Sequence, residues 1–574
     1  MGSDRDRKSI KPSRRAVLTA SLSAAVGVAV ARLAGLRAFD ERIAGIEAQK
    51  LLGLRPSAPG APVAVDIAGA PESMPAAIGA LAPELPLPAT PMLPRPGAAI
   101  PPTLAVSGDA SVAAPGASAR PLPAARQPDA VTGGAIRGAS YDWDSPLGSE
   151  SARVSQLMRR ATFGATDAEL ERALSDGYAR TVDRLVETPF ADPPPLAGAD
   201  DANQTKPLQV QALQTWWLDA MQTSPTPFGE RMTLFWHGHF TSDYRKVGLQ
   251  SPFMYWQNQT FRRQGLGDLK TMLMSVTTDP AMLRYLDLGI STGRNPNENY
   301  ARELMELYSL GVDRFSEDDV RAAAKALAGW REPRTQAMVD ALNARAKPGA
   351  MPAVADPGKS GVFDRARAFS GPLTYLGKTG SFDTEAVIDR ILAQDATAPF
   401  VVRRVLAQFV HRTPADALVD RLAARFRAGR YDLKSLMRDV FTSPEFSSSE
   451  SYRALVKSPI EFMVSVAKAL GTTPQLTRAI NGASSGMGQV LFDPPSVGGW
   501  PRNEAWVSSN TVVARANFVT QAIGQTRTLP AGVDAYKRHL DGIVGPATAE
   551  LLTNATDDRS RWSVVLSSAE FQLK

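Results

Sequence analysis

Helical periodicity limits the fold of this chain more than any other feature. From about Tyr141 onward, apolar residues recur with the period of an α-helix, whereas sustained alternation of apolar and polar residues between turns is hard to find. Three helix starts can be located because a Ser or Thr stands three residues before an acid, the capping-box pattern. They are Thr166–Glu169, Ser316–Asp319 and Ser458–Glu461. The sequence therefore predicts a mainly α, multi-helix fold.

The helical pattern lapses once, in a segment rich in Gly and Pro at 333–380. A chain of 574 residues is long enough to form more than one lobe. We expect a helical domain over 141–574 with two lobes, 141–345 and 381–574. The irregular segment between them is either a lid or binding loop, or an inserted surface excursion.

The N-terminal segment, 1–38, has the features of a twin-arginine export signal. Arg14 and Arg15 precede an Ala-rich apolar run that Arg32 and Arg37 close early. We expect an exported protein, periplasmic or extracellular, and the signal is either cleaved or kept as a membrane anchor. A cytoplasmic location is a third, less favoured interpretation.

The following segment, 39–140, is rich in Pro, Ala and Gly. No Phe, Trp or Tyr occurs between Phe39 and Tyr141, so no large side chain is present to form a core. We expect a disordered, polyproline-like linker between the signal and the helical domain.

The net charge of +6 is concentrated at the N-terminus. Residues 1–40 contain eight Lys or Arg and three Asp, which leaves the rest of the chain at +1. A nearly neutral body argues against a nucleic-acid surface, which requires clustered basic residues. We therefore expect no nucleic-acid partner, and membrane contact only through an uncleaved N-terminal segment. The absence of Cys excludes disulfides and thiolate chemistry.

A glutamate-bearing helix is the first candidate site. Its start and stop signals predict one helix from Asn295 to Gly311, and Glu303 falls within its apolar face. Asn299 and Glu306 lie on the same edge of the helix. A carboxylate facing the core needs a partner, because an unpaired buried charge is very unfavourable. The apolar face consists of Tyr300, Leu304, Leu307 and Leu310.

Two of the four histidines of the chain, His237 and His239, flank Gly238 and form the second candidate site. In a loop or extended segment the two imidazoles would point the same way. Together with Glu303 they would offer a ligand set suited to Zn, Fe, Mn or Ni, and a metal there could activate water. Asp243, Glu306 and Asn299 would support that site.

A structural interpretation of the same residues remains open. Glu298–Arg302 and Arg302–Glu306 are spaced four residues apart, so Glu306 would form a surface salt bridge. Glu303 would then bond a histidine or a backbone amide without any metal, in a polar network that fixes helix packing.

Five motifs occur in order along the chain, at Arg159–Gly164, Trp236–Phe240, Asn297–Leu307, Ala328–Trp330 and Gly498–Pro501. Together they resemble the DUF1800 family of bacterial exported proteins, over roughly residues 150–574. The family has no assigned function, but its members are often encoded beside DUF1501 proteins, so the resemblance implies a partner of that type.

Two functions follow from these observations. The first is a hydrolase-like or other metal-assisted or acid–base enzyme of the cell envelope, with His237, His239 and Glu303 as catalytic residues or ligands. The second is a non-catalytic envelope assembly or binding protein that acts with a DUF1501-type partner. The sequence does not decide between an enzyme and a binding protein.

Overall fold

The structure, a computed structural model, describes residues 145–199, 208–249, 252–347 and 350–574. The expected signal (1–38) and linker (39–140) lie outside the described residues. Over the described part, helices dominate and the strands form two small antiparallel pairs, which confirms the mainly α prediction. Among the same residues, no helix has both the length and the apolar character needed to span a bilayer.

The three predicted capping boxes are all present. The side chains of Thr166, Ser316 and Ser458 each accept a hydrogen bond from the amide three residues later. The acidic side chain at that later position accepts a hydrogen bond from the backbone amide of the Ser or Thr. The helices before the irregular segment are η1 (Pro146–Gly148), α3 (Glu150–Ala161), α4 (Asp167–Glu187), α5 (Val210–Thr223), α6 (Pro227–His237), α7 (Tyr244–Val247), α8 (Phe253–Gln264), α9 (Leu269–Thr277), α10 (Pro280–Tyr285), η2 (Leu288–Ile290), α11 (Asn299–Glu306) and α12 (Glu317–Ala326).

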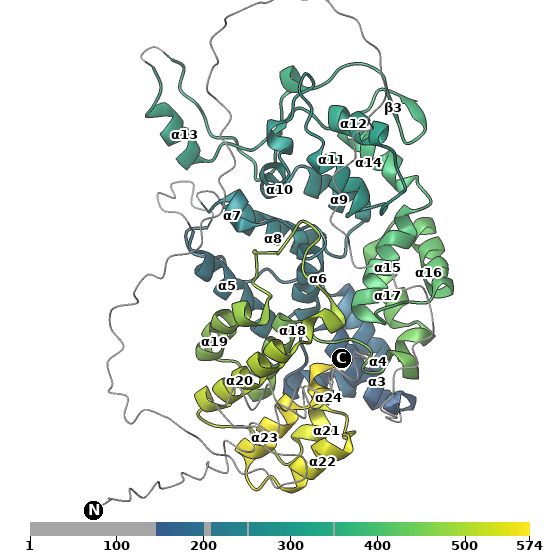
Figure 1. Ribbon diagram of the computed structural model, residues 1–574, viewed down its shortest axis with the longest axis vertical. Coiled ribbons are helices and arrows are strands. Elements are labelled where there is room, and N and C mark those ends of the chain that lie inside the picture. The colour runs from purple at the N-terminus through teal and green to yellow at the C-terminus, as the bar shows by residue number, and fades with distance from the viewer. Residues whose placement is uncertain (1–144, 200–207, 250–251, 348–349) are drawn as a thin grey trace, which may run out of the picture.

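The segment 333–380 is irregular, as expected, although it also contains the short helix α13 (Gln336–Asn343), which projects from the body in Figure 1. Strand β1 (Trp330–Arg331) pairs antiparallel with β2 (Val362–Phe363), so the excursion returns to the point where it began. Helix η3 (Arg365–Arg367) follows, and β3 (Leu373–Tyr375) forms a hairpin with β4 (Lys378–Gly380).

The remainder of the chain is again helical. In Figure 1, α15–α17 line one side of the body, and α21–α24 close its lower end. These helices are α14 (Thr384–Leu392), α15 (Thr397–Phe409), α16 (Asp416–Ala428), α17 (Leu433–Phe441), η4 (Pro444–Ser447), η5 (Ser449–Ser451), α18 (Pro459–Leu470), α19 (Pro474–Ser484), η6 (Ser485–Met487), η7 (Asn503–Trp506), α20 (Ser509–Gln525), α21 (Ala535–His539), α22 (Pro546–Thr553), α23 (Asp558–Ser567) and α24 (Ala569–Gln572).

Helix α6 lies between the two large hydrophobic clusters of the fold. Trp236 belongs to the cluster built mainly from α9–α12 and α14–α17, and Leu234 to the cluster built mainly from α5, α18–α20 and α23. Every residue of α6 after its first is buried. A helix that is covered all round occupies a core position. The division into lobes at 333–380 stays a prediction.

The glutamate-bearing helix is shorter than predicted. Only Asn299–Glu306 is helical, and turns follow as far as Gly311. Asn297 accepts a hydrogen bond from the Asn299 amide at 3.0 Å, so its side chain forms a turn before the helix instead of extending it. Gly311 does end the segment, with a φ of 90°.

Candidate functional site

His237 is the last residue of α6, so it lies on a helix end and not in the expected loop. Its Nε2 accepts a hydrogen bond from the Phe492 amide at 3.2 Å, and its ring lies 5.2 Å from those of Trp217 and Trp500. Burial lowers the pKa of His237 to about 3. The imidazole is therefore neutral, and its Nε2 lone pair is occupied by a backbone amide.

His239 contacts a different part of the fold. Its Nε2 lies 3.1 Å from the carbonyl oxygen of Tyr308 and must donate to it, which leaves Nδ1 unprotonated. Among the described residues Nδ1 has no hydrogen-bond partner. Burial, with repulsion from Arg404, holds the pKa of His239 well below its usual range. Several aromatic rings surround the imidazole, from Phe235, Trp236, Phe240, Tyr308 and Phe400.

Glu303 is half-buried, and neither histidine pairs with it. Its pKa is raised, first because burial disfavours the carboxylate and then because Glu306 repels it, while Arg302 opposes both effects. Within the described chain its carboxylate forms no hydrogen bond or ion pair. Among the described residues Glu303 therefore has neither the histidine nor the backbone-amide partner that the sequence suggested.

The three expected supporting residues have other local roles. Asp243 caps α7 by accepting a hydrogen bond from the Arg245 amide at 2.8 Å. Asn299 is exposed and donates to Asp287 at 3.1 Å. Glu306 is half-buried next to Glu303, and it does not form the expected ion pair with Arg302.

Arg302 pairs instead with Glu298, as the four-residue spacing suggested, and with Glu317 of α12. The nearest Arg302 nitrogen lies 3.6 Å from a Glu298 oxygen and 2.6 Å from a Glu317 oxygen. These partly exposed pairs link α11 to α12 at the surface.

The described residues contain no group of three or more His, Asp or Glu side chains that could hold a metal ion. The structure therefore does not support the expected Zn, Fe, Mn or Ni site. The physical reason is that the chain turns after α6, so His237 and His239 meet different segments, at Phe492 and Tyr308. A catalytic role for His237, His239 or Glu303 stays a prediction.

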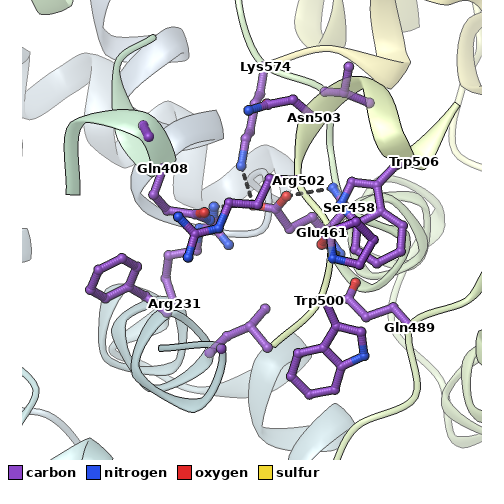
Figure 2. Close-up of a pocket in the computed structure, with 16 residues that line it drawn as sticks. Arg231, Gln408, Ser458, Glu461, Gln489, Trp500, Arg502, Asn503, Trp506 and Lys574 are labelled. Carbon is purple, nitrogen blue, oxygen red and sulfur yellow. Dashed lines mark hydrogen bonds and ion pairs between the residues drawn. The ribbon is translucent and has the colours of Figure 1, made fainter. Parts of the chain in front are cut away.

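A cavity of about 60 Å³ lies beside the histidine motif, between α6, α15, the start of α18 and residues 500–506. Figure 2 shows its polar side chains around a common space. Of the described residues that line it, one is acidic, Glu461, and three are basic, Arg231, Arg502 and Lys574. The remaining lining residues are Leu234, Phe235, Gly238, Ala407, Gln408, Val456, Ser458, Gln489, Trp500, Pro501, Asn503 and Trp506.

Glu461 is the electrostatic centre of this cavity. It forms ion pairs with Arg231 and Lys574, and its other oxygen accepts the Ser458 amide at 2.7 Å in the capping box of α18 (Figure 2). Burial alone raises the pKa of Glu461, but attraction to Arg231 and Lys574 outweighs it, so the pKa falls to about 2. Burial and repulsion from Arg231 lower the pKa of Lys574 to about 7.

The histidine motif, Trp236–Phe240, contacts the Gly498–Pro501 motif at the cavity wall. Gly499 has a φ of 85°, and a Cβ there would lie 2.6 Å from the Gly238 carbonyl oxygen, so only glycine fits. Thr241 also donates a hydrogen bond to the Val497 carbonyl. The glycine contact brings Trp500 over His237 and into the cavity lining.

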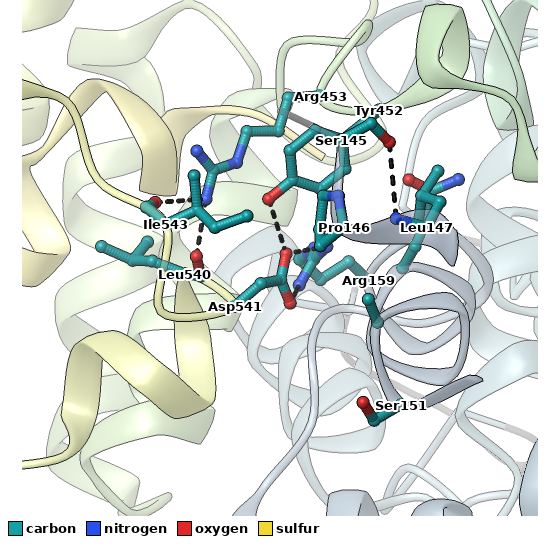
Figure 3. Close-up of polar contacts among 12 residues, drawn as sticks. Ser145, Pro146, Leu147, Ser151, Arg159, Tyr452, Arg453, Leu540, Asp541 and Ile543 are labelled. Carbon is teal, nitrogen blue, oxygen red and sulfur yellow. Dashed lines mark hydrogen bonds and ion pairs between the residues drawn. The ribbon is translucent and has the colours of Figure 1, made fainter. Parts of the chain in front are cut away.

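The Arg159–Gly164 motif contacts the same region through Arg160. Arg160 is fully buried and donates to the carbonyls of Phe409 and Val410 at 2.9 and 2.7 Å, while its own carbonyl accepts Arg231 Nε. The preceding Arg159 is paired instead with Asp541, through two hydrogen bonds of 2.7 Å (Figure 3). Adjacent arginines thus differ in that only Arg159 has a carboxylate partner.

No sequence pattern groups Arg231 with Glu461 and Lys574. Arg231 itself can be picked out, because the predicted helix Phe228–Trp236 is mostly apolar. A cation in that setting requires a partner. The partner of Arg231 could not be predicted, because the sequence around Glu461 shows only the capping box of a helix.

The fold and this cavity define a mainly α protein with a buried ion-pair cluster at the meeting point of its motifs. The model of the family "Protein of unknown function (DUF1800)" matches residues 156–573, and the chain belongs to that family. No curated protein and no solved structure matches the chain. The family membership confirms the resemblance and assigns no activity.

Proposed function

We propose that the protein is an exported binding protein of the cell envelope, with the cavity at Glu461 as its ligand site. One observation carries the proposal. Two of the five family motifs line this cavity, at Gly238 and at Trp500 and Pro501, and a third contacts its lining where the Arg160 carbonyl accepts Arg231 Nε. Two buried donors of the lining residues, Arg231 Nη1 and Trp500 Nε1, have no hydrogen-bond partner among the described residues. Buried donors are normally satisfied, so unpaired ones at a cavity indicate a missing partner.

The arrangement of the histidines supports binding over metal-assisted hydrolysis. Both imidazoles bond to the backbone, and Glu303 lies apart from them. A general base must be within hydrogen-bond reach of its substrate, and His237 uses its Nε2 lone pair on the Phe492 amide.

Metal analysis and hydrolysis assays separate the two functions. We expect the purified protein to contain no stoichiometric Zn, Fe, Mn or Ni. We also expect no hydrolysis of chromogenic ester, phosphoester or glycoside substrates that depends on Glu303. A stoichiometric metal that is lost in His237→Gln, or a hydrolysis rate that falls in Glu303→Gln, would favour the enzyme and overturn the proposal.

A ligand screen tests the cavity directly. Trp500→Phe removes the Nε1–H donor and keeps a smaller aromatic ring over His237. We expect at least one small molecule from a mixed panel of neutral and charged compounds to raise the unfolding midpoint of the wild type more than that of Trp500→Phe. Trp256→Phe, a tryptophan outside the cavity lining, serves as the control. If no compound distinguishes the wild type from Trp500→Phe, the cavity is not a ligand site.

A DUF1501-type protein is the proposed partner in the envelope. Co-purification of a tagged chain with the product of a neighbouring DUF1501 gene tests this part independently. Recovery of that product with the tagged wild type, but not with an unrelated exported control, is the expected result.

A further inference from the structure

The charges around Glu461 do not balance. Five buried cationic side chains lie within electrostatic range of this single carboxylate. Each is at most 4% exposed, so water does not screen them effectively. They are Arg160, Arg231, Lys457, Arg515 and Lys574.

The hydrogen bonds of the other cations go to neutral oxygens. Arg160 donates to main-chain carbonyls, and Arg515 donates to the Lys457 carbonyl at 2.8 Å and to Gln572 at 3.0 Å. The Lys457 ammonium nitrogen lies 3.8 Å from the ring centroid of Phe571. These contacts place the cations but supply no negative charge.

The residues that line the cavity also carry more positive than negative charges. Arg502 is half-buried at its rim, and no acidic side chain pairs with it in the described part of the chain. Burial, together with repulsion from Arg404, lowers the pKa of Arg502 to about 10. Arg231 Nη1 and Trp500 Nε1 remain as unpaired buried donors.

From the unpaired donors and the uncompensated cations, we infer that the cavity binds a small oxyanion group, a carboxylate or a phosphate. This inference rests on the proposed function, because it names the chemical class of the ligand for the same site. Guanidinium groups bind both oxyanions with directed hydrogen bonds. A space of 60 Å³ also exceeds the roughly 15 Å³ that one water molecule needs, so it admits a group of several atoms.

The rim explains how such a group would enter. Pro501 is exposed and Arg502 and Asn503 are half-buried, so the cavity opens beside residues 501–503. An oxyanion attached to a larger molecule would insert there, while the rest of the molecule stays outside.

Titrations with inorganic phosphate, acetate and acetamide, the neutral analogue of acetate, test the inference on the full protein in low-chloride buffer. Phosphate or acetate should raise the unfolding midpoint of the wild type, and acetamide should not. We expect Arg502→Gln and Trp500→Phe to weaken the fitted anion affinity at least about tenfold, as loss of a hydrogen bond to a charged group does. Arg478→Gln, an exposed arginine outside the cavity, should bind as the wild type does.

The outcomes separate the ligand class from the site. A response to phosphate alone indicates a phosphate ester as the ligand, and a response to acetate indicates a carboxylate. An equal shift in the wild type and all variants is the general effect of salt on protein stability and overturns the oxyanion inference. If a neutral compound distinguishes the wild type from Trp500→Phe while neither anion does, the proposed binding function survives and the oxyanion inference fails.

Discussion

At the scale of single residues, His237 is a base that the fold keeps uncharged. Its pKa is about 3 in the folded protein, against 6.5 for an exposed imidazole. Between these pH values the unfolded chain binds a proton that the folded chain excludes, so acid lowers the free energy of unfolding by up to about 1.4 kcal/mol per pH unit.

We therefore expect His237→Gln to lose less stability than the wild type between pH 6.5 and pH 4. A glutamine can still accept the Phe492 amide but does not titrate. Urea unfolding at both pH values measures the change. An unchanged pH dependence in His237→Gln would show that this imidazole takes up a proton in the folded protein as readily as in the unfolded chain.

The histidine motif also shows how far residues can be read from sequence. The rarity of histidine and the glycine between His237 and His239 point to a segment whose Gly238 lines the cavity, while a catalytic role for the histidines stays a prediction. The directions of the two side chains were not predictable, because each is set by a distant segment. The amide that bonds His237 is 255 residues away in the sequence, at Phe492.

At the scale of elements, the close contact between Gly499 and the end of α6 predicts a severe effect of a single methyl group. Gly499→Ala would place a Cβ 2.6 Å from the Gly238 carbonyl oxygen at a φ of 85°. The 498–501 segment would have to move, and Trp500 with it. We expect a loss of about 1–3 kcal/mol in unfolding free energy, together with loss of the ligand response at the cavity.

Gly482→Ala is the matched control, because Gly482 lies within α19 and its Cβ would meet nothing within 4 Å. Alanine favours a helix interior, so this change should be neutral or stabilise the fold by up to about 1 kcal/mol. Denaturant unfolding of both variants gives the comparison. Equal stability of Gly499→Ala and the wild type would contradict the proposed contact.

Elements were predictable where their signals are local. The capping boxes at Thr166, Ser316 and Ser458 each lie within four residues, and all three form. The predicted helix Asn295–Gly311 is longer than the observed one for a reason at each end. Before the helix, the Asn297 side chain accepts the Asn299 amide in a turn. After it, the Leu310 amide donates to the Met305 carbonyl five residues back, instead of continuing the helix.

At the scale of the whole molecule, the export prediction concerns residues that the structure does not describe. We expect Arg14→Lys with Arg15→Lys to retain the protein in the cytoplasm, since such a signal is an address read by a receptor and the charge is unchanged. Cell fractionation measures the location. Arg5→Lys with Arg7→Lys is the control and should be exported. Normal export of the Arg14/Arg15 variant would rule out a twin-arginine signal.

The mainly α class and the family were readable from the whole sequence, whereas the cavity was not. Its charged residues come from α6, α18, the 500–506 segment and the last described residue, and no local pattern links Arg231, Glu461, Arg502 and Lys574. Only the folded chain shows that one acid serves several cations.

The pairing of residues 455–457 with 572–574 has a consequence for ligand linkage. Lys574 and Leu455 exchange backbone hydrogen bonds, and Lys574 also pairs with Glu461, so two segments far apart in the sequence close the cavity together. A compound that bound only the closed cavity would therefore hold these two segments together, and would protect their backbone amides from hydrogen exchange.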